Sequence, residues 1–190
     1  MGVAYVMLTL VGLAYNSLGY DGPGLAMLMA APIRFRDVLL AKNLLHSLLV
    51  LVEVFVIFVL VQFIAGPTPP LVVGVTLAGA LWILFANLAA GNLVSLYFPR
   101  KLNFGQMRRQ QASGMAVAVN MGIQLLLVGV ATGAYFLARW AGHLGLCGIA
   151  FLALAGGAWL AYRRVLNMTS DIAWKRREVL MAELSRPDSS

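Results

Sequence analysis

The chain has 190 residues, of which 61% are hydrophobic and 11% charged, and its formal net charge is +7. A soluble domain carries about 25% charged residues, so this composition excludes a water-covered surface and indicates a protein embedded in lipid. The positive charge does not indicate nucleic-acid binding, because the basic residues cluster in short segments outside the apolar runs and form no aromatic-interleaved patch of the kind that binds nucleic acid. We therefore expect an all-α, polytopic transmembrane helix bundle.

Continuous apolar segments give the expected spanning helices. Each is close to or longer than the roughly 20 residues that cross a bilayer as a helix. The five segments cover residues 3–19, 38–64, 71–98, 112–138 and 144–162. None alternates as a β-strand would. The first has no preceding Lys or Arg, so it does not resemble a signal peptide, and we expect it to span the membrane.

Positive charge predicts which side of the membrane each loop faces. Every Lys and Arg except Arg139 falls between the first and second segments, in the first turns of the second, between the third and fourth, or after the fifth. The positive-inside rule makes that side cytoplasmic. We expect a multi-pass protein of the plasma (inner) membrane, with a transmembrane domain over residues 1–167 and a cytoplasmic basic tail over residues 168–190. With five crossings, the N-terminus is expected outside.

The tail is expected to contain a short amphipathic helix over residues 169–185. Ser170 or Asp171 is the expected N-cap. Trp174 and the neighbouring basic residues suit an anionic membrane surface, so an interfacial anchor is favoured over a binding site for a specific partner.

The connection over residues 21–42 contains a second short helix. Glycine and proline at residues 22–24 break the first segment, residues 25–31 are almost entirely apolar, and Pro32 ends that run. Lys42 is expected to reach the membrane interface from the next helix. A short apolar helix at this side needs burial, either against its own bundle or in a groove of a cytoplasmic partner. Physical grounds alone favour the first.

This connection resembles a loop in the membrane subunits of type-2, exporter-like ABC transporters. There, a Gly-Thr pair is followed by a leucine-rich turn, a Ser-Pro or Thr-Pro, an Arg, an acidic residue and a Gly-Lys. The positions that correspond here are Pro23, Gly24, Leu25, Met27, Leu28, Met29, Ala31, Pro32, Arg36, Asp37, Ala41 and Lys42. The chain departs from the pattern where Pro23-Gly24 replaces Gly-Thr and Ala26 replaces an often acidic or polar residue. The five segments resemble helices two to six of a six-helix permease, which implies a missing first helix or the C-terminal part of a longer permease.

The resemblance implies that residues 25–31 are a coupling helix seated in a cleft of a cytoplasmic ATP-binding cassette ATPase. It implies an ATPase-coupling role for Leu25, Ala26, Met27, Leu28, Met29, Pro32, Arg34 and Arg36. It also implies a dimer with a second permease copy or half. The chain has no GxxxxGK[ST] motif, so we expect no catalytic residues or cofactor in it, with ATP and Mg²⁺ bound by the partner subunit.

A few polar residues lie inside the apolar segments. Glu53 is near the middle of the second segment, where an ionisable side chain is costly and is expected to face protein or water. Asn120 and Gln124, one turn apart in the fourth segment, are expected to be hydrogen-bond partners. All three are candidates for the translocation path, or for a structural hydrogen-bonded contact. His46 and His143 are expected on opposite sides of the membrane, so no metal site is predicted.

Small residues are expected to let helices approach closely, with Gly129 and Gly133 in the fourth segment and Gly145, Gly148, Gly156 and Gly157 in the fifth. Two functions remain as alternatives to the exporter permease. One is an ATP-independent channel or an ion-coupled carrier that uses Glu53, and the other is a non-catalytic membrane scaffold. The sequence does not indicate the transported substrate.

Overall fold

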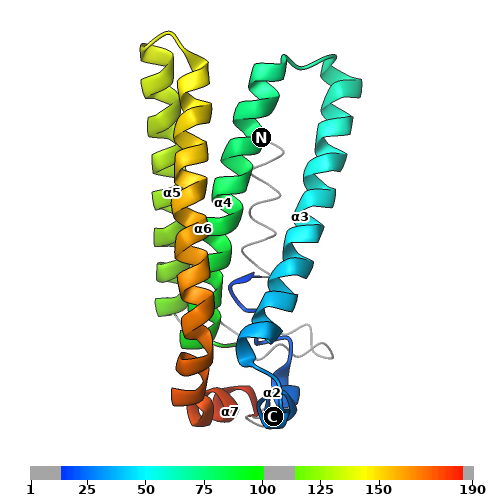
Figure 1. Cartoon of the computed structure of the whole chain (residues 1–190), viewed down its shortest axis with the longest axis vertical. Coiled ribbons are helices and arrows are strands. Elements are labelled where there is room, and N and C mark those ends of the chain that lie inside the picture. The colour runs from blue at the N-terminus through cyan, green and yellow to red at the C-terminus, as the bar shows by residue number, and fades with distance from the viewer. Residues whose placement is uncertain (1–13, 101–113, 186–190) are drawn as a thin grey trace.

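The computed structural model describes residues 14–100 and 114–185, and all regular structure in these ranges is helical. The elements in chain order are the 3-10 helix η1 (Gly22–Gly24), α2 (Leu25–Ala30), α3 (Phe35–Ala65), α4 (Pro70–Tyr97), α5 (Gly114–Trp140), α6 (Leu144–Lys175) and α7 (Arg177–Ser185). The four long helices stand side by side, and α2 and α7 lie across one end of the bundle (Figure 1).

The predicted polytopic helical bundle is confirmed. Helices α3 to α6 are long and apolar enough to cross a membrane. The segments predicted at 38–64, 71–98 and 112–138 correspond to α3, α4 and α5. Most of the segment predicted at 3–19 lies outside the described residues. Its last part, residues 15–19, forms turns, in which the Gly19 amide donates to the Asn16 carbonyl oxygen at 3.0 Å.

Helix α6 extends well beyond its predicted end at residue 162, because no proline or glycine interrupts the chain between Tyr162 and Lys175. The prediction that Ser170 or Asp171 caps a separate tail helix is therefore wrong, since both lie inside α6. In the part of the tail that the structure describes, up to residue 185, only α7 forms a separate helix. The domain boundary drawn at residue 167 stays a prediction.

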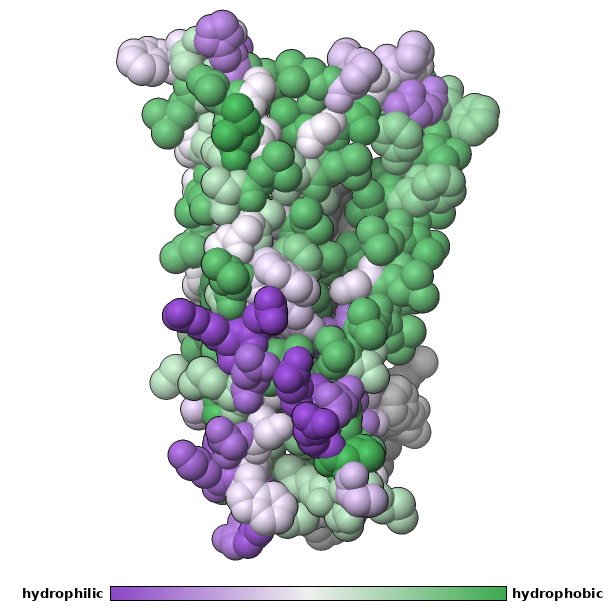
Figure 2. Space-filling view, viewed as in Figure 1, coloured by the Kyte–Doolittle hydropathy of each residue, from purple (hydrophilic) through white to green (hydrophobic). Residues whose placement is uncertain are grey.

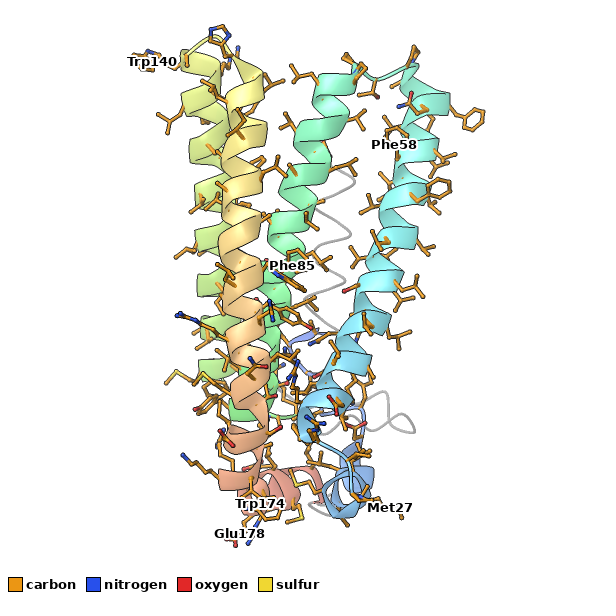
Figure 3. All side chains as sticks on the ribbon, in the orientation of Figure 1. Met27, Phe58, Phe85, Trp140, Trp174 and Glu178 are labelled. Carbon is orange, nitrogen blue, oxygen red and sulfur yellow. The ribbon has the colours of Figure 1, made fainter. Side chains whose placement is uncertain are left out.

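Helix α4 packs along α6 for most of its length. The rings of Trp82 and Phe151 stack with centroids 5.6 Å apart. Gly79 admits Phe151 to this contact, because a Cβ at Gly79 would lie 3.2 Å from the ring. Closer to the α7 end, Phe85 (labelled in Figure 3) packs on Trp159 at 4.9 Å between centroids. This aromatic row makes α4 and α6 the central pair of the bundle.

The glycines of α5 and α6 have different surroundings. A Cβ at Gly148 would lie 3.3 Å from Val75, so the predicted close packing is confirmed there. Gly129 and Gly133 have no described neighbour within 4 Å of such a Cβ, so the described helices do not pack closely on them, and their packing role stays a prediction. Gly133 instead lines a groove of about 580 Å³ between α5 and α6, together with Leu146 and Ala150 of α6.

The two ends of the bundle differ in charge. All described Lys and Arg residues except Arg139 lie in the half of the bundle that ends in α2 and α7, which we call the basic end. The opposite end, which carries residues 66–69 and 141–143, is the loop end. In Figure 2, apolar side chains cover most of the upper half of the visible face below a mixed rim at the loop end, and hydrophilic side chains gather toward the basic end. Which end faces the cytoplasm stays a prediction.

Gly91 of α4 provides a test of the packing at the basic end. A Cβ there would lie 2.8 Å from the Ala14 carbonyl oxygen. We expect Gly91→Ala to displace the backbone at Ala14 and to lower the free energy of unfolding by about 1–3 kcal/mol. Gly74→Ala is the matched control, because no described atom lies within 4 Å of its Cβ position. Thermal denaturation in detergent micelles measures both variants, and equal stabilities would contradict the close approach.

Candidate functional site

Helix α2 is buried on one face and exposed on the other. Leu25 is fully covered and belongs to the main hydrophobic core, and the half-buried Met29 packs against that core. Met27 is 79% exposed, and Ala26 and Ala30 are also exposed. Figure 3 shows Met27 at the basic end, pointing away from the bundle. The bundle therefore covers part of α2, as physical grounds predicted, and leaves an apolar face open.

The remaining residues predicted for coupling lie beside a groove between α2, the start of α3 and the end of α6. Leu28 is half-buried there, and Pro32, Arg34 and Arg36 are exposed. The groove has a volume of about 440 Å³. Its walls are formed mainly by Leu28, Met29, Ile33, Phe35, Ala173 and Trp174, with Arg34 and Asp171 also lining it. The structure thus brings Leu28, Met29 and Arg34 to one surface.

Lys42 ties the segment before α2 to α3. Its Nζ lies 2.6 Å from Asp21 Oδ2 and donates to the Ser17 carbonyl oxygen at 2.7 Å. The two charged side chains are only 20% and 19% exposed. The ion pair and the carbonyl therefore cover most of the Lys42 ammonium, and its position at the membrane interface stays a prediction. Since Asp21 directly precedes η1 and Phe35 begins α3, α2 is attached to α3 on both sides.

Helix α7 attaches the same region to the rest of the bundle. Leu180 and Leu184 are fully buried in the core, and α7 packs against η1 and α2. At the corner between α6 and α7, Arg176 Nη1 donates to the Leu96 carbonyl oxygen at 2.7 Å, and its guanidinium lies 4.8 Å from the Tyr97 ring centroid. A cation is favourable at this helix C-terminus. We call η1, α2 and α7 together the basal layer.

Helix lengths locate the basal layer relative to the lipid. Large exposed apolar side chains on α3 run from Leu44 to Ile64, a distance of about 30 Å, which equals the thickness of the hydrocarbon. Phe35 lies about 13 Å further along the helix. On α6, the exposed Arg164 marks the same boundary, and Lys175 lies about 16 Å beyond it. By helix length, the basal layer therefore lies outside the hydrocarbon of about 30 Å, and the predicted interfacial anchor stays a prediction.

A buried polar cluster joins three parts of the chain inside the bundle. Tyr15 Oη donates to Asn87 Oδ1 at 2.9 Å, and Gln124 Nε2 donates to Asn87 Oδ1 at 2.7 Å and to Tyr15 Oη at 3.1 Å. The predicted pairing of Asn120 with Gln124 is wrong, because neighbouring elements supply the partners of Gln124. Asn120 Oδ1 is buried and has no hydrogen-bond partner among the described residues.

The three predicted translocation residues are not joined by this cluster. None of its hydrogen bonds involves Glu53, which lies half-buried near the middle of α3. Sequence reasoning missed Tyr15, because a tyrosine in an apolar segment gives no sign that its hydroxyl is buried against an amide. The role of Glu53 in transport stays a prediction.

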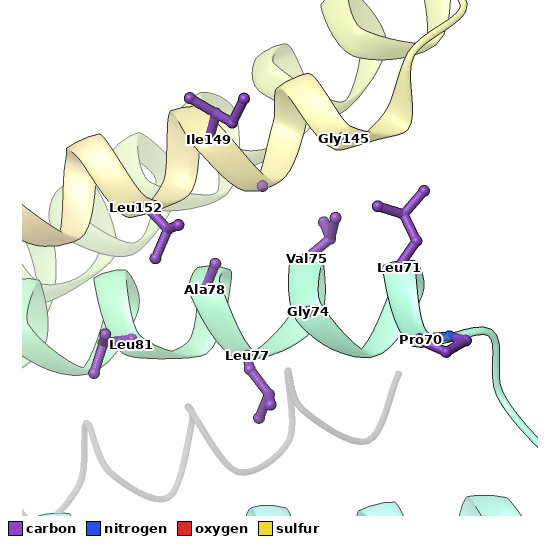
Figure 4. A pocket seen from close by; sticks show the side chains of 11 residues that line it. Pro70, Leu71, Gly74, Val75, Leu77, Ala78, Leu81, Gly145, Ile149 and Leu152 are labelled. Carbon is purple, nitrogen blue, oxygen red and sulfur yellow. The ribbon is translucent and has the colours of Figure 1, made fainter.

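An apolar groove also opens between α4 and α6 at the loop end (Figure 4), with a volume of about 490 Å³. It is lined by Pro70, Leu71, Gly74, Val75, Leu77, Ala78, Leu81, Gly145, Gly148, Ile149 and Leu152. These side chains provide no hydrogen bond for a polar solute, so the groove suits lipid acyl chains.

Within residues 14–100 and 114–185, no group of three or more His, Cys, Asp or Glu side chains is placed to hold a metal ion. His46 lies in the half of α3 toward the basic end and His143 lies at the loop end.

No protein-family model, no curated protein and no solved structure matches this chain.

The Lys42–Asp21 pair gives a direct test of how α2 is held. We expect Lys42→Met and Asp21→Asn each to lower the free energy of unfolding by about 1–3 kcal/mol, because each leaves a partly buried charge without its partner. The double variant should lose less than the sum of the two, with a coupling of about 0.5–3 kcal/mol.

The exposed pair Arg34–Asp37, 3.9 Å apart, is the control. Its neutralisation should cost about 0–1 kcal/mol. Denaturation in detergent micelles measures all variants. Strictly additive losses for Lys42 and Asp21 would contradict their direct interaction.

Proposed function

We propose that this chain is the membrane-spanning permease subunit of an ATP-driven exporter of the type-2 ABC class. In this proposal a separate cytoplasmic ATPase subunit binds ATP and Mg²⁺, and a second permease copy or half completes the transporter. The observation that carries the proposal is α2, an apolar helix that lies outside the hydrocarbon, exposes Met27 and is attached to α3 on both sides. The resemblance of residues 21–42 to the coupling loop supports it.

The contacts of the basal layer suit the transmission of force. A push on α2 reaches α3 through the chain at Phe35 and through the Lys42–Asp21 pair. It reaches α4 through α7, which packs on α2 and is joined to the Leu96 carbonyl by Arg176. The Arg36 amide donates to Ser170 Oγ at 3.1 Å, which links the start of α3 to α6. Three spanning helices would therefore tilt together, as rigid-body alternating access requires.

Orientation follows from charge in this proposal. The basic end faces the cytoplasm of the plasma (inner) membrane, in agreement with the positive-inside rule. Glu53, Asn120 and Gln124 are proposed to line the path together with the second copy. A carrier driven by Glu53 alone has no use for an exposed apolar helix outside the hydrocarbon, and this observation favours the ATPase-coupled function.

The test is the loss of ATPase coupling when the exposed face of α2 becomes charged. We expect Met27→Glu to abolish co-purification of an ATP-binding cassette subunit and the ATP hydrolysis that accompanies it. A buried acidic charge without a partner costs several kcal/mol. Protein purified from its native membrane in mild detergent supplies both readouts. His143→Glu is the matched control, because it adds the same charge at an exposed position of the loop end.

Two results would sink the proposal. The first is a Met27→Glu variant that inserts normally and keeps the wild-type ATP hydrolysis of the complex. The second is solute transport that stops with Glu53→Gln alone in a preparation without any ATP-binding subunit, which would establish an ion-coupled carrier.

A further inference from the structure

Two side chains near the basic end are buried without hydrogen-bond partners. Asn92 of α4 is 1% exposed, and neither its Oδ1 nor its Nδ2 has a partner among the described residues. His46 of α3 is 7% exposed, and its Nδ1 also lacks a partner in the described ranges. Buried amides and imidazoles are almost always hydrogen-bonded, and a bound water or ligand is a common reason when the protein supplies no partner.

These two side chains lie at similar depths in the bundle, where three helices meet. Measured from the loop end, His46 lies about 28 Å and Asn92 about 33 Å along their antiparallel helices. Asn43, one turn before His46 on the buried face of α3, donates to Tyr162 Oη of α6 at 3.2 Å. The Tyr162 ring in turn stacks on Phe85 of α4, with 6.3 Å between centroids and two turns before Asn92. Helices α3, α4 and α6 therefore meet at the depth of both side chains.

The unused groups define the chemistry of a ligand. Asn92 offers one acceptor oxygen and two N–H donors, and a neutral imidazole adds an acceptor or a donor. The nearest charged group on α3, Lys42, is already paired with Asp21. A hydroxyl both donates and accepts, so it can satisfy these neutral groups, whereas an ion would be buried here without a counter-charge.

We propose that Asn92 and His46 form a binding site for a small neutral hydroxyl group, either water or the hydroxyl of a solute. The site does not depend on the ATPase partner, so it stands or falls separately from the proposed function. The proposal implies that the bundle is hydrated at the depth of Asn92 and His46. One helical turn closer to the loop end, the interior is expected to be dry.

Thiol accessibility tests the site in the full chain. The single cysteine, Cys147, is first replaced in Cys147→Ala. Asn92→Cys and His46→Cys are then made in this background, with Leu88→Cys and Val50→Cys as matched controls. Leu88 and Val50 are buried one turn closer to the loop end on the same helices.

A water-soluble thiol reagent should modify the two site variants about tenfold faster than their controls, because thiolate formation needs a polar surrounding. The rates are measured by mass spectrometry in detergent micelles. Slowing of both reactions by added glycerol assigns the site to solute hydroxyls, and unchanged rates assign it to water. Site variants that react no faster than their controls overturn the proposal.

A second measurement decides the matter if the cysteine variants do not fold. In a dry site, Asn92→Leu removes two unpaired polar groups and raises the thermal midpoint. With a bound hydroxyl, it removes hydrogen bonds instead, and the midpoint should fall by roughly 2–4 °C for a chain of this size. A rise in the midpoint overturns the proposal.

Discussion

Lipid offers no hydrogen bond to a peptide group, and that constraint underlies the whole architecture. Helices α3 to α6 satisfy it by pairing their backbone groups internally. It acts on the side chains as well, because a polar group in the bundle has to find its partner within the protein. The Tyr15–Asn87–Gln124 cluster and the pair of Lys42 with Asp21 are two results of this requirement.

The two halves of the molecule satisfy the constraint in different ways. Toward the loop end, the helices meet through apolar contacts such as the Trp82–Phe151 stack, and α3 exposes most of its large apolar side chains. Toward the basic end, polar contacts join α3, α4, α6 and the basal layer, and these depend on direction and distance. The hydrogen bonds and ion pair at the basic end are directional, so they hold the basal layer and the attached helices together as a unit. The apolar packing toward the loop end is not directional, which suits movement of that unit.

The placement of the basal layer outside the hydrocarbon connects the fold to the proposed function. An apolar side chain such as Met27 is normal where it faces lipid, but beyond the headgroups it has neither lipid nor protein to cover it. In the proposed function, the cytoplasmic ATPase subunit would cover that exposed surface. The tail helix α7 belongs to the same layer, because Leu180 and Leu184 hold it against the core that also contains Leu25.

Part of the candidate site was predictable from local patterns. Pro32 and the apolar residues before it predicted the short helix that is observed as α2. This worked because a proline restricts the residue next to it, and an apolar run is visible in the sequence without knowledge of the fold. The partners of Lys42 and Gln124 were not predictable in the same way. Asp21 precedes η1 and α2, whereas Lys42 lies in α3, so the two are separated by both short helices. Tyr15 and Asn87 come from segments far from Gln124 in the chain. Their side chains meet only when the helices pack.

By itself, the amino-acid sequence determined the lipid environment, the helical class and the approximate spans of α3, α4 and α5, because the length of an apolar run and its breakers are local properties. Tertiary structure alone decided which faces are covered. Within the described residues, Gly129 and Gly133 have no close neighbour, Gly148 packs on Val75, and Asn92 and the Nδ1 atom of His46 have no hydrogen-bond partner. The physical reason is that in lipid both faces of a helix are apolar, so hydrophobic periodicity does not indicate which of them meets another helix.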